Sequence, residues 1–199
     1  MEEIQNPAKP EGIGGSKMLD RMNRSHKPIR DFALPLFDWK ENMYILDAGC
    51  GGGATIHEML EYAKDSKIEG IDYSEVSVEK SKELNKDYLD TRVHIQWADV
   101  VSLPFEDNTF DLVTGMETIY FWPEPEKGLK EIYRVLKENG HIMIMNEGSD
   151  PDHLDWPSID GFMKVYRPEE LIQLFNEAGF KDVVCHHGEG QMICVIGKK

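Results

Sequence analysis

Long hydrophobic runs are absent from this sequence of 199 residues. No apolar stretch approaches the ~20 residues that a membrane-spanning helix needs. The first residues, Met-Glu-Glu-Ile-Gln-Asn-Pro, also lack the basic segment and apolar run of a secretory signal. We therefore expect a cytoplasmic protein with neither a signal peptide nor a transmembrane helix.

Basic residues are few. Lysine and arginine number 22 against 37 aspartates and glutamates, which gives a formal net charge of −15. Most of such a surface repels the phosphates of nucleic acids and of anionic membranes. No run of Lys or Arg offers a local exception. We expect neither nucleic acid nor a membrane as a partner.

Cysteine is also scarce. Cys50, Cys185 and Cys194 make an odd count without the spacing of a metal site. The simplest interpretation is that they are buried free thiols in a reducing compartment. The rest of the composition, 40% hydrophobic and 30% charged, is ordinary for one globular domain with a sizeable core.

The most informative stretch is 45–53, which reads Ile-Leu-Asp-Ala-Gly-Cys-Gly-Gly-Gly. Ile45 and Leu46 end a short apolar run that is typical of a buried parallel strand, and from Ala54 the apolar spacing becomes helical. The glycines between them allow a tight turn and a close approach of ligand to backbone. Because open α/β sheets bind ligands beyond the carboxyl ends of their strands, we expect the cofactor here.

Two classes of cofactor are compatible with such a turn. Residues 49–54 fit the G-x-G-x-x-G/A pattern of dinucleotide sites. Asp47, however, would repel a pyrophosphate and suits a ligand that carries an ammonium group. Together with Leu46 and the glycines at 49, 51 and 53, Asp47 resembles motif I of the class I S-adenosylmethionine (SAM)-dependent methyltransferases.

Two further acids follow predicted strands. Asp72 ends the strand 67–71 about 20 residues beyond the glycines, where a carboxylate can accept both ribose hydroxyls of NAD or of SAM. Asp99 follows the strand 92–97 and is well placed to accept the exocyclic amine of adenine. The stretch 103–113 is similar to the segment that leads into the fourth strand of the methyltransferases.

The remaining pattern predicts an α/β chain. We expect strands near 43–48, 67–71, 92–97, 111–116, 141–145, 180–186 and 191–196, and helices near 54–64, 74–90, 123–138 and 168–178. A glycine-containing loop joins the last two strands as an antiparallel hairpin, which is not the pattern of a six-stranded parallel NAD domain. The proline- and glycine-containing residues 1–16 are predicted to be a flexible arm.

The resemblance covers about 44–195 and implies an α/β, Rossmann-like methyltransferase fold. Its sheet is doubly wound, mostly parallel and seven-stranded, with a C-terminal antiparallel hairpin. A single domain would span 17–199, with N-terminal lid helices at 17–40 and the α/β core at 43–199. The resemblance also implies SAM as cofactor and S-adenosylhomocysteine as product. The cofactor-binding residues would be Asp47, Ala48, Gly49, Cys50, Gly51, Gly53, Asp72, Tyr73, Ala98, Asp99, Val100 and Met116.

The methyl acceptor is expected against the aromatic segment that follows the fourth strand. Tyr120, Phe121 and Trp122 form the predicted substrate wall, together with Glu147 at the end of the fifth strand. The lid helices and the loop 148–165 would close over the acceptor.

The catalytic residue is left open. Methyl transfer requires alignment and exclusion of water, and a general base is needed only if the nucleophile arrives protonated. The main candidates are Tyr120, Glu117 and His26, and the further candidates are His153, His186 and His187. No compact cluster of three carboxylates or histidines stands in the sequence, so no metal is expected.

The sequence therefore predicts a SAM-dependent methyltransferase that acts on a small-molecule acceptor. One alternative is an NAD-dependent oxidoreductase, which Asp47, Asp99 and the terminal hairpin disfavour. Another is a non-catalytic SAM-binding subunit that supports a partner enzyme. A protein or RNA methyltransferase is disfavoured by the size and the acidic charge. Neither the acceptor nor the oligomeric state follows from the sequence.

Overall fold

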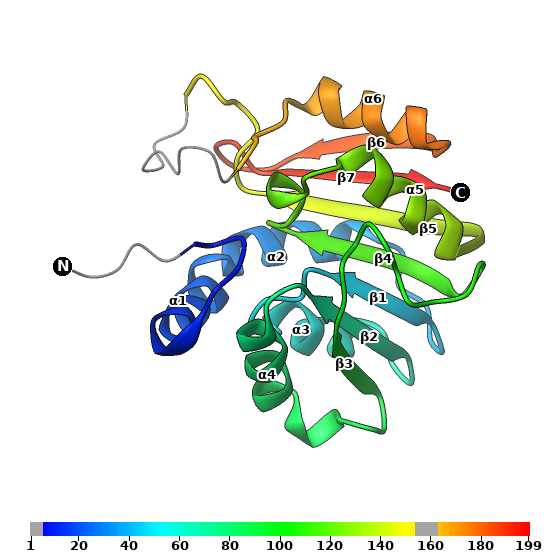
Figure 1. Ribbon diagram of the computed structural model, residues 1–199. Helices are drawn as coiled ribbons and strands as arrows, with labels where there is room; N and C mark the ends of the chain where they lie inside the picture. The colour runs from blue at the N-terminus through cyan, green and yellow to red at the C-terminus, as the bar shows by residue number, and fades with distance from the viewer. Residues whose placement is uncertain (1–5, 154–162) are drawn as a thin grey trace.

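The computed structural model describes residues 6–153 and 163–199, and in this part seven strands form one sheet (Figure 1). The strand order is β3-β2-β1-β4-β5-β7-β6, and β7 runs antiparallel to the other six strands. The strands are β1 (Tyr44–Ala48), β2 (Lys67–Asp72), β3 (Val93–Trp97), β4 (Phe110–Met116), β5 (Leu136–Asn146), β6 (Lys181–His187) and β7 (Ile193–Lys198). The predicted seven-stranded sheet with its C-terminal hairpin is confirmed.

Helices cover both faces of the sheet (Figure 1). They are α1 (Gly12–Ser25), α2 (Lys27–Ala33), α3 (Ala54–Tyr62), α4 (Glu75–Leu84), α5 (Pro125–Val135) and α6 (Pro168–Ala178). One core cluster contains apolar residues of α5 and α6, and a second contains those of α2, α3 and α4. Within the described ranges, no helix is both long and apolar enough to cross a bilayer.

Strand β5 shows how the two layers share the sheet. Ile142 and Ile144 belong to the cluster with α5 and α6, whereas Met143 and Met145 belong to the cluster with α2 and α3. Successive side chains of a strand point to opposite faces, and here helices cover both faces. An uninterrupted apolar run at this position therefore fits a fully buried strand.

Local signals account for several helix ends. The hydroxyl of Ser74 accepts a hydrogen bond from the Ser77 N–H (3.2 Å) and caps α4. Gly179 has a φ of 107° and ends α6, which is the conformation that favours glycine at a helix C-terminus. At the start of α6, Glu170 accepts the Arg167 N–H (2.7 Å) in place of a Ser or Thr cap.

Several predicted boundaries differ from the structure; helix α4 ends at Leu84 rather than near residue 90, and a 3-10 turn at Lys86–Tyr88 follows it. Helix α1 begins at Gly12, inside the stretch predicted as an arm, and the preceding Pro10 is buried. Helix α5 ends at Val135, because Leu136 already pairs with Phe110 of β4, so β5 starts five positions earlier than predicted. Pairing with β4 has overridden the helical spacing of residues 136–138 here. Of the loop predicted at 148–165, residues 154–162 lie outside the described residues.

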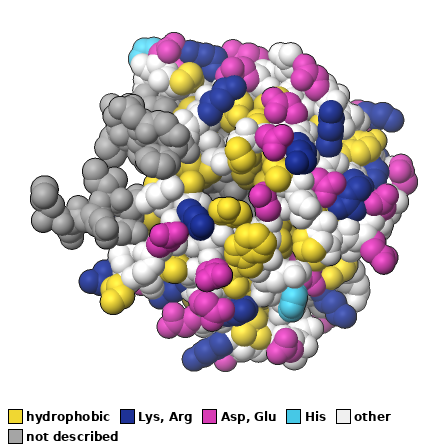
Figure 2. Space-filling model, in the orientation of Figure 1, with side chains coloured by type: hydrophobic (Ala, Val, Ile, Leu, Met, Phe, Trp, Pro, Cys, Tyr) yellow, Lys and Arg dark blue, Asp and Glu magenta, His cyan; other side chains and the backbone are white. Residues whose placement is uncertain are grey.

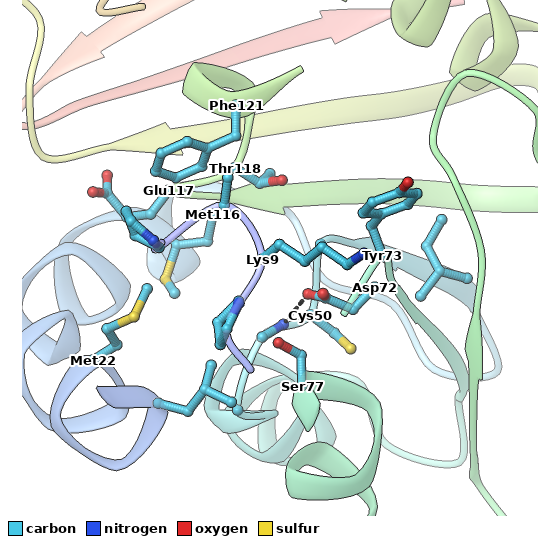
Figure 3. A pocket seen from close by; sticks show the side chains of 18 of the residues that line it. Lys9, Met22, Cys50, Asp72, Tyr73, Ser77, Met116, Glu117, Thr118 and Phe121 are labelled. Atoms are coloured by element: carbon cyan, nitrogen blue, oxygen red, sulfur yellow. Dashed lines mark hydrogen bonds between the residues drawn. The ribbon is translucent and has the colours of Figure 1, made fainter. Parts of the chain in front are cut away.

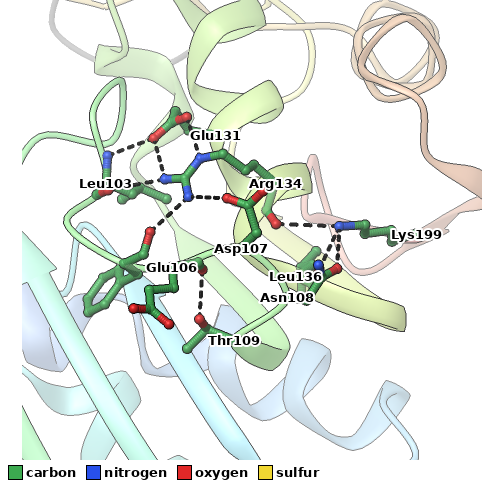
Figure 4. A network of polar contacts seen from close by, with 10 residues as sticks. Leu103, Glu106, Asp107, Asn108, Thr109, Glu131, Arg134, Leu136 and Lys199 are labelled. Carbon is green, nitrogen blue, oxygen red and sulfur yellow. Dashed lines mark hydrogen bonds and ion pairs between the residues drawn. The ribbon is translucent and has the colours of Figure 1, made fainter.

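The connection into β4 is fixed by one arginine (Figure 4). The Arg134 guanidinium donates to the carboxylates of Glu131 and Asp107 and to the carbonyl oxygens of Leu103 and Phe105, at 2.8–3.1 Å. These bonds tie the segment before β4 to α5. The chain is thereby fixed where it enters β4, the strand that pairs with β1 in the centre of the sheet.

Candidate cofactor and acceptor site

A cavity of about 420 Å³ lies beyond the carboxyl ends of the central strands. The residues that follow β1, β2, β3 and β4 line it, and α1 together with residues 6–10 lines another side. This volume is in the range of small-molecule and cofactor sites. The position is also the one at which open α/β sheets bind ligands.

The glycine turn after β1 forms one wall of the cavity. Gly49 has a φ of 86°, and its N–H and that of Cys50 donate to the carbonyl oxygen of Ile71, at 2.8 and 2.9 Å. Gly49, Cys50 and Gly51 line the cavity as predicted. Gly53 does not line it; a Cβ there would lie 2.5 Å from the Ser81 hydroxyl, so this glycine permits close packing of the helix.

Asp72 forms the next part of the wall, at the end of β2 (Figure 3). One carboxylate oxygen accepts the Gly51 N–H (2.9 Å) and the other accepts the Ser74 N–H (2.8 Å). Burial raises the pKa of Asp72, while the bonds from Ser74 and Gly51 oppose that rise. A carboxylate oxygen has a second acceptor site, so both oxygens can still accept a hydroxyl from the cavity. The arrangement fits the two adjacent hydroxyls of a ribose.

Asp47 lies behind the turn rather than on the cavity wall, as do Ala48 and Gly53. Its side chain is 1% exposed and accepts a hydrogen bond from the Thr114 hydroxyl (2.7 Å). Burial raises the pKa of Asp47 to about 7, against the lowering effect of the Thr114 bond. In this geometry Asp47 supports the turn from below and does not touch the cavity.

The remaining predicted cofactor residues line the cavity. They are Tyr73, Ala98, Asp99, Val100 and Met116. Asp99 lies at the β3 side and caps its own turn, with its carboxylate accepting the Val101 N–H (3.1 Å). An acid and apolar side chains thus share the side of the cavity at which an adenine was expected.

The opposite end of the cavity carries Glu117 and Phe121, whereas Trp122 packs near Val100 on the side at which an adenine was expected. Glu117, Phe121 and Trp122 line the cavity, and Figure 3 shows Glu117 and Phe121 beside Met116, away from Asp72 and Tyr73. Glu117 is 9% exposed and has a φ of 55°, an uncommon conformation for a residue other than glycine. Burial raises the pKa of Glu117 to about 7, while the charge of His26 lowers it.

Tyr120, predicted as both a base and part of the substrate wall, is turned away from the cavity. Its hydroxyl lies 2.9 Å from both the N–H and the carbonyl oxygen of Gly148, and 3.3 Å from a Glu117 oxygen. Burial raises the pKa of Tyr120 well above its ordinary value. The side chain therefore anchors the segment after β5 and supports Glu117.

His26 and Glu147 meet at the edge of this end. His26 lies between α1 and α2, lines the cavity, and places Nδ1 3.0 Å from Oε2 of Glu147. Burial lowers the pKa of His26, but the hydrogen bond to Glu147 and the negative charges of Glu117 and Glu147 outweigh it, so the pKa is raised. Glu147 itself does not line the cavity but holds the imidazole that does.

The N-terminal segment contributes to the cavity wall, which was not predicted from the sequence. Residues 6–10 line the cavity, and Lys9 Nζ lies 5.0 Å from the centre of the Tyr73 ring. The carbonyl oxygen of Pro10 accepts the Ser74 hydroxyl (2.6 Å), and the Asn23 amide donates to the Gly52 carbonyl oxygen (3.0 Å). A segment rich in Pro and Gly carries no periodic signal, so only these contacts could place it.

Comparison with known proteins agrees with this geometry. Residues 39–187 match the family model described as a methyltransferase domain. The chloroplastic 2-methyl-6-phytyl-1,4-hydroquinone methyltransferase 2 of Oryza sativa subsp. japonica is 33% identical over 156 residues, which cover 78% of this chain and 44% of that protein. Cycloartenol-C-24-methyltransferase 1 of the same plant is 35% identical over 155 residues, which cover 71% and 44%. The chain thus matches under half the length of each relative.

Solved structures show the same fold. A SAM-dependent methyltransferase from Aquifex aeolicus aligns over 92% of this chain and 97% of its own, with a TM-score of 0.79 and 21% sequence identity. The family match sets the nicotinamide alternative aside. With the glycine turn after β1, the acid at the end of β2 and the terminal hairpin all in place, this chain belongs to the class I SAM-dependent methyltransferase family.

Proposed function

We propose that the protein transfers a methyl group from SAM to a small-molecule acceptor bound at the Glu117–Phe121 end of the cavity. Bound SAM supplies a methyl group on a sulfonium, which is already a good leaving group. Asp72 would hold the ribose hydroxyls, Asp99 the adenine amine, and the glycine turn the methionine part. The observation that carries the proposal is Asp72, which lines the cavity beside that turn and has each carboxylate oxygen oriented by a backbone N–H.

The acceptor end supplies alignment and exclusion of water. Phe121 gives it an apolar wall, while Glu117 and His26 give it groups that can accept a proton. These are the requirements of an in-line displacement with a nucleophile that arrives protonated. The names of the relatives, which are hydroquinone and sterol methyltransferases, support a small-molecule acceptor.

The test is ligand-dependent stabilisation of the isolated chain. We expect SAM and S-adenosylhomocysteine to raise the unfolding free energy by about 2.7 kcal/mol at 100 times their dissociation constants. NAD and NADP should have no effect. A shift with the nicotinamide nucleotides alone, or with none of the four, would overturn the proposal. Methyl transfer by the isolated chain to small acceptors, tested in the same samples, separates an enzyme from a non-catalytic SAM-binding subunit.

Asp72→Ala is the matching variant. Loss of a buried, charged hydrogen-bond partner should cost roughly 1–3 kcal/mol of SAM binding, or about 5- to 150-fold in affinity, measured by titration calorimetry. Glu75→Gln serves as the control, because it also removes one negative charge but lies exposed on α4, off the cavity. Equal SAM affinity in wild type and a folded Asp72→Ala protein would contradict the ribose role.

A further inference from the structure

Three potential metal ligands converge at the acceptor end of the cavity. His26, Glu117 and Glu147 each offer one ligand atom, and these atoms all lie within 4.8 Å of one another. Among the described His, Cys, Asp and Glu residues, no other group of three meets this geometry. The three lie far apart in the sequence, between α1 and α2, after β4 and after β5, so no sequence motif announces them.

The existing contacts leave the ligand atoms available. Nδ1 of His26 and Oε2 of Glu147 are 3.0 Å apart. Bonds of 2.0–2.2 Å to one ion place neighbouring ligand atoms roughly 3–3.5 Å from each other, so this pair already has a suitable spacing. In Glu117, Oε1 accepts the Glu147 N–H and the Tyr120 hydroxyl, while Oε2 accepts no hydrogen bond from the part of the chain that the structure describes.

Glu117 combines two unfavourable features, a buried carboxyl group and a left-handed backbone conformation. It is more than nine-tenths buried, lies on the cavity wall, and adopts a left-handed φ of 55°. Such a conformation persists only where the surrounding structure enforces it, and it is concentrated at functional sites. A buried acid beside a second acid is stabilised by a neighbouring positive charge, which His26 supplies when it is protonated and which a bound cation can supply in its place.

We propose that His26, Glu117 and Glu147 bind a divalent first-row transition-metal ion of the Mn²⁺ or Zn²⁺ type. Imidazole and carboxylate together suit these ions better than Ca²⁺ or Mg²⁺, which prefer oxygen alone. Two carboxylates and a neutral imidazole balance a charge of +2. Three protein ligands leave further positions open, as in catalytic metal sites. Here they face the cavity beside Phe121, where an oxygen or nitrogen atom of a bound small molecule can complete the coordination.

A second His–Glu pair provides the matched control. Nδ1 of His94 on β3 lies 2.7 Å from Oε2 of Glu69 on β2, and the His94 side chain is 55% exposed. This pair has the same two residue types as His26 and Glu147 but no third ligand group among the residues described. Loss of metal binding on substitution of His26 but not of His94 would therefore indicate a three-ligand site rather than ordinary weak binding to an exposed imidazole.

The experiment is calorimetric titration of the chelator-treated full chain with MnCl₂ and with ZnCl₂, without SAM. We expect one equivalent of at least one of the two ions to bind. His26→Ala and Glu147→Gln should each weaken that binding at least tenfold, and His94→Ala should leave it unchanged. Bound Mn²⁺ is counted independently by the loss of the free-ion electron paramagnetic resonance signal.

The absence of saturable binding of both ions would overturn the proposal, as would equal weakening by His94→Ala and His26→Ala. Circular dichroism melts identify a variant that fails to fold, and the other variant then gives the answer. Because the titration contains no SAM, this inference can fail while the proposed function stands. Normal SAM binding in a chain that binds no metal would be that outcome.

Discussion

At the scale of single residues, Asp47 is the least expected feature of the site. It is part of the motif that resembles the methyltransferases, yet its carboxyl group is buried against Thr114 and the cavity wall lies elsewhere. Burial is the main cause of its raised pKa; the negative Asp72 adds to it, and the Thr114 bond and the positive Arg30 oppose it. In the folded protein without ligand, this acid therefore prefers to be protonated up to a pH of about 7.

This environment makes a prediction about stability and pH. The folded chain keeps the Asp47 proton between the unfolded pKa, about 4, and the folded pKa of about 7, so its contribution to stability falls as the pH rises through that interval. Asp47→Asn removes this fall. The unfolding free energy of the variant, relative to wild type, should rise by roughly 2–3 kcal/mol between pH 5 and pH 8, at about 1.4 kcal/mol per pH unit.

Urea unfolding of both proteins at the two pH values, without ligand, measures this difference. Other titrating groups such as Glu117 are present in both proteins and largely cancel. Asparagine brings an amide that needs its own partners, so the absolute stability of the variant can be lower at either pH. A difference that does not change with pH would mean that Asp47 is ionised throughout.

At the scale of elements, one buried cation joins α1 and α2 to α3, in addition to the apolar packing of α2. Arg30 is 2% exposed, and it donates to the Glu58 carboxylate on α3 (2.9 Å) and to the Asn23 carbonyl oxygen on α1 (2.7 Å). Asn23 in turn bonds Gly52 in the glycine turn. Arg30 and Asn23 together thus link the helices over the cavity to α3 and to the glycine turn.

Arg30→Ala should loosen this link. Loss of its charged hydrogen bonds is expected to lower the unfolding free energy by about 1.5–3 kcal/mol and to weaken SAM binding, because Asn23, which bonds the glycine turn, loses its support. Lys27→Ala is the control, since Lys27 lies on the same helix in an exposed pair with Asp31 and should have little effect. Denaturant unfolding and SAM titration check both. Equal changes in the two variants would contradict the role assigned to Arg30.

The elements also show what the sequence can and cannot foretell. The strands, α3, α6 and their caps follow from apolar periodicity and from residues such as Ser74 and Gly179, because those signals act within a few residues. The start of α1 and the end of α5 could not be predicted in this way. Leu136 pairs with Phe110 on β4, and the chain entering α1 is held at Pro10, which packs against Gly15 and accepts a hydrogen bond from the Ser74 hydroxyl.

The same distinction applies to the site. Residues directly after a predicted strand, such as Asp72, Asp99 and Met116, line the cavity as expected, because parallel strands end at one edge of the sheet. The orientation of Tyr120 and the meeting of His26 with Glu147 depend on how helices and loops return over that edge. Those paths are set by packing, which a single sequence does not encode locally.

At the scale of the whole molecule, the charge is the dominant property. Acidic side chains are spread over the face seen in Figure 2 rather than gathered at one place, with Lys and Arg between them. The chain has 37 acids and 22 bases, so 15 acids lack a basic partner even if every base is paired. Acids near the acceptor end are therefore no evidence in themselves for a cationic acceptor.

The excess of acids predicts how stability responds to salt. Raising NaCl from about 10 mM to about 150 mM shortens the Debye length from about 30 Å to about 8 Å and screens repulsion between unpaired acids. Screening also weakens the surface ion pairs, but exposed pairs of this kind contribute little. We expect repulsion to dominate; a gain of about 1 kcal/mol would raise Tm by about 2–4 °C in a chain of this size. The Tm from thermal melts should rise steeply across this range of salt and then level off. If exclusion of ions from the surface were the cause instead, the Tm would continue to rise steadily up to molar salt. A falling Tm would mean that the paired charges, and not the excess of acids, decide the electrostatic stability of the fold.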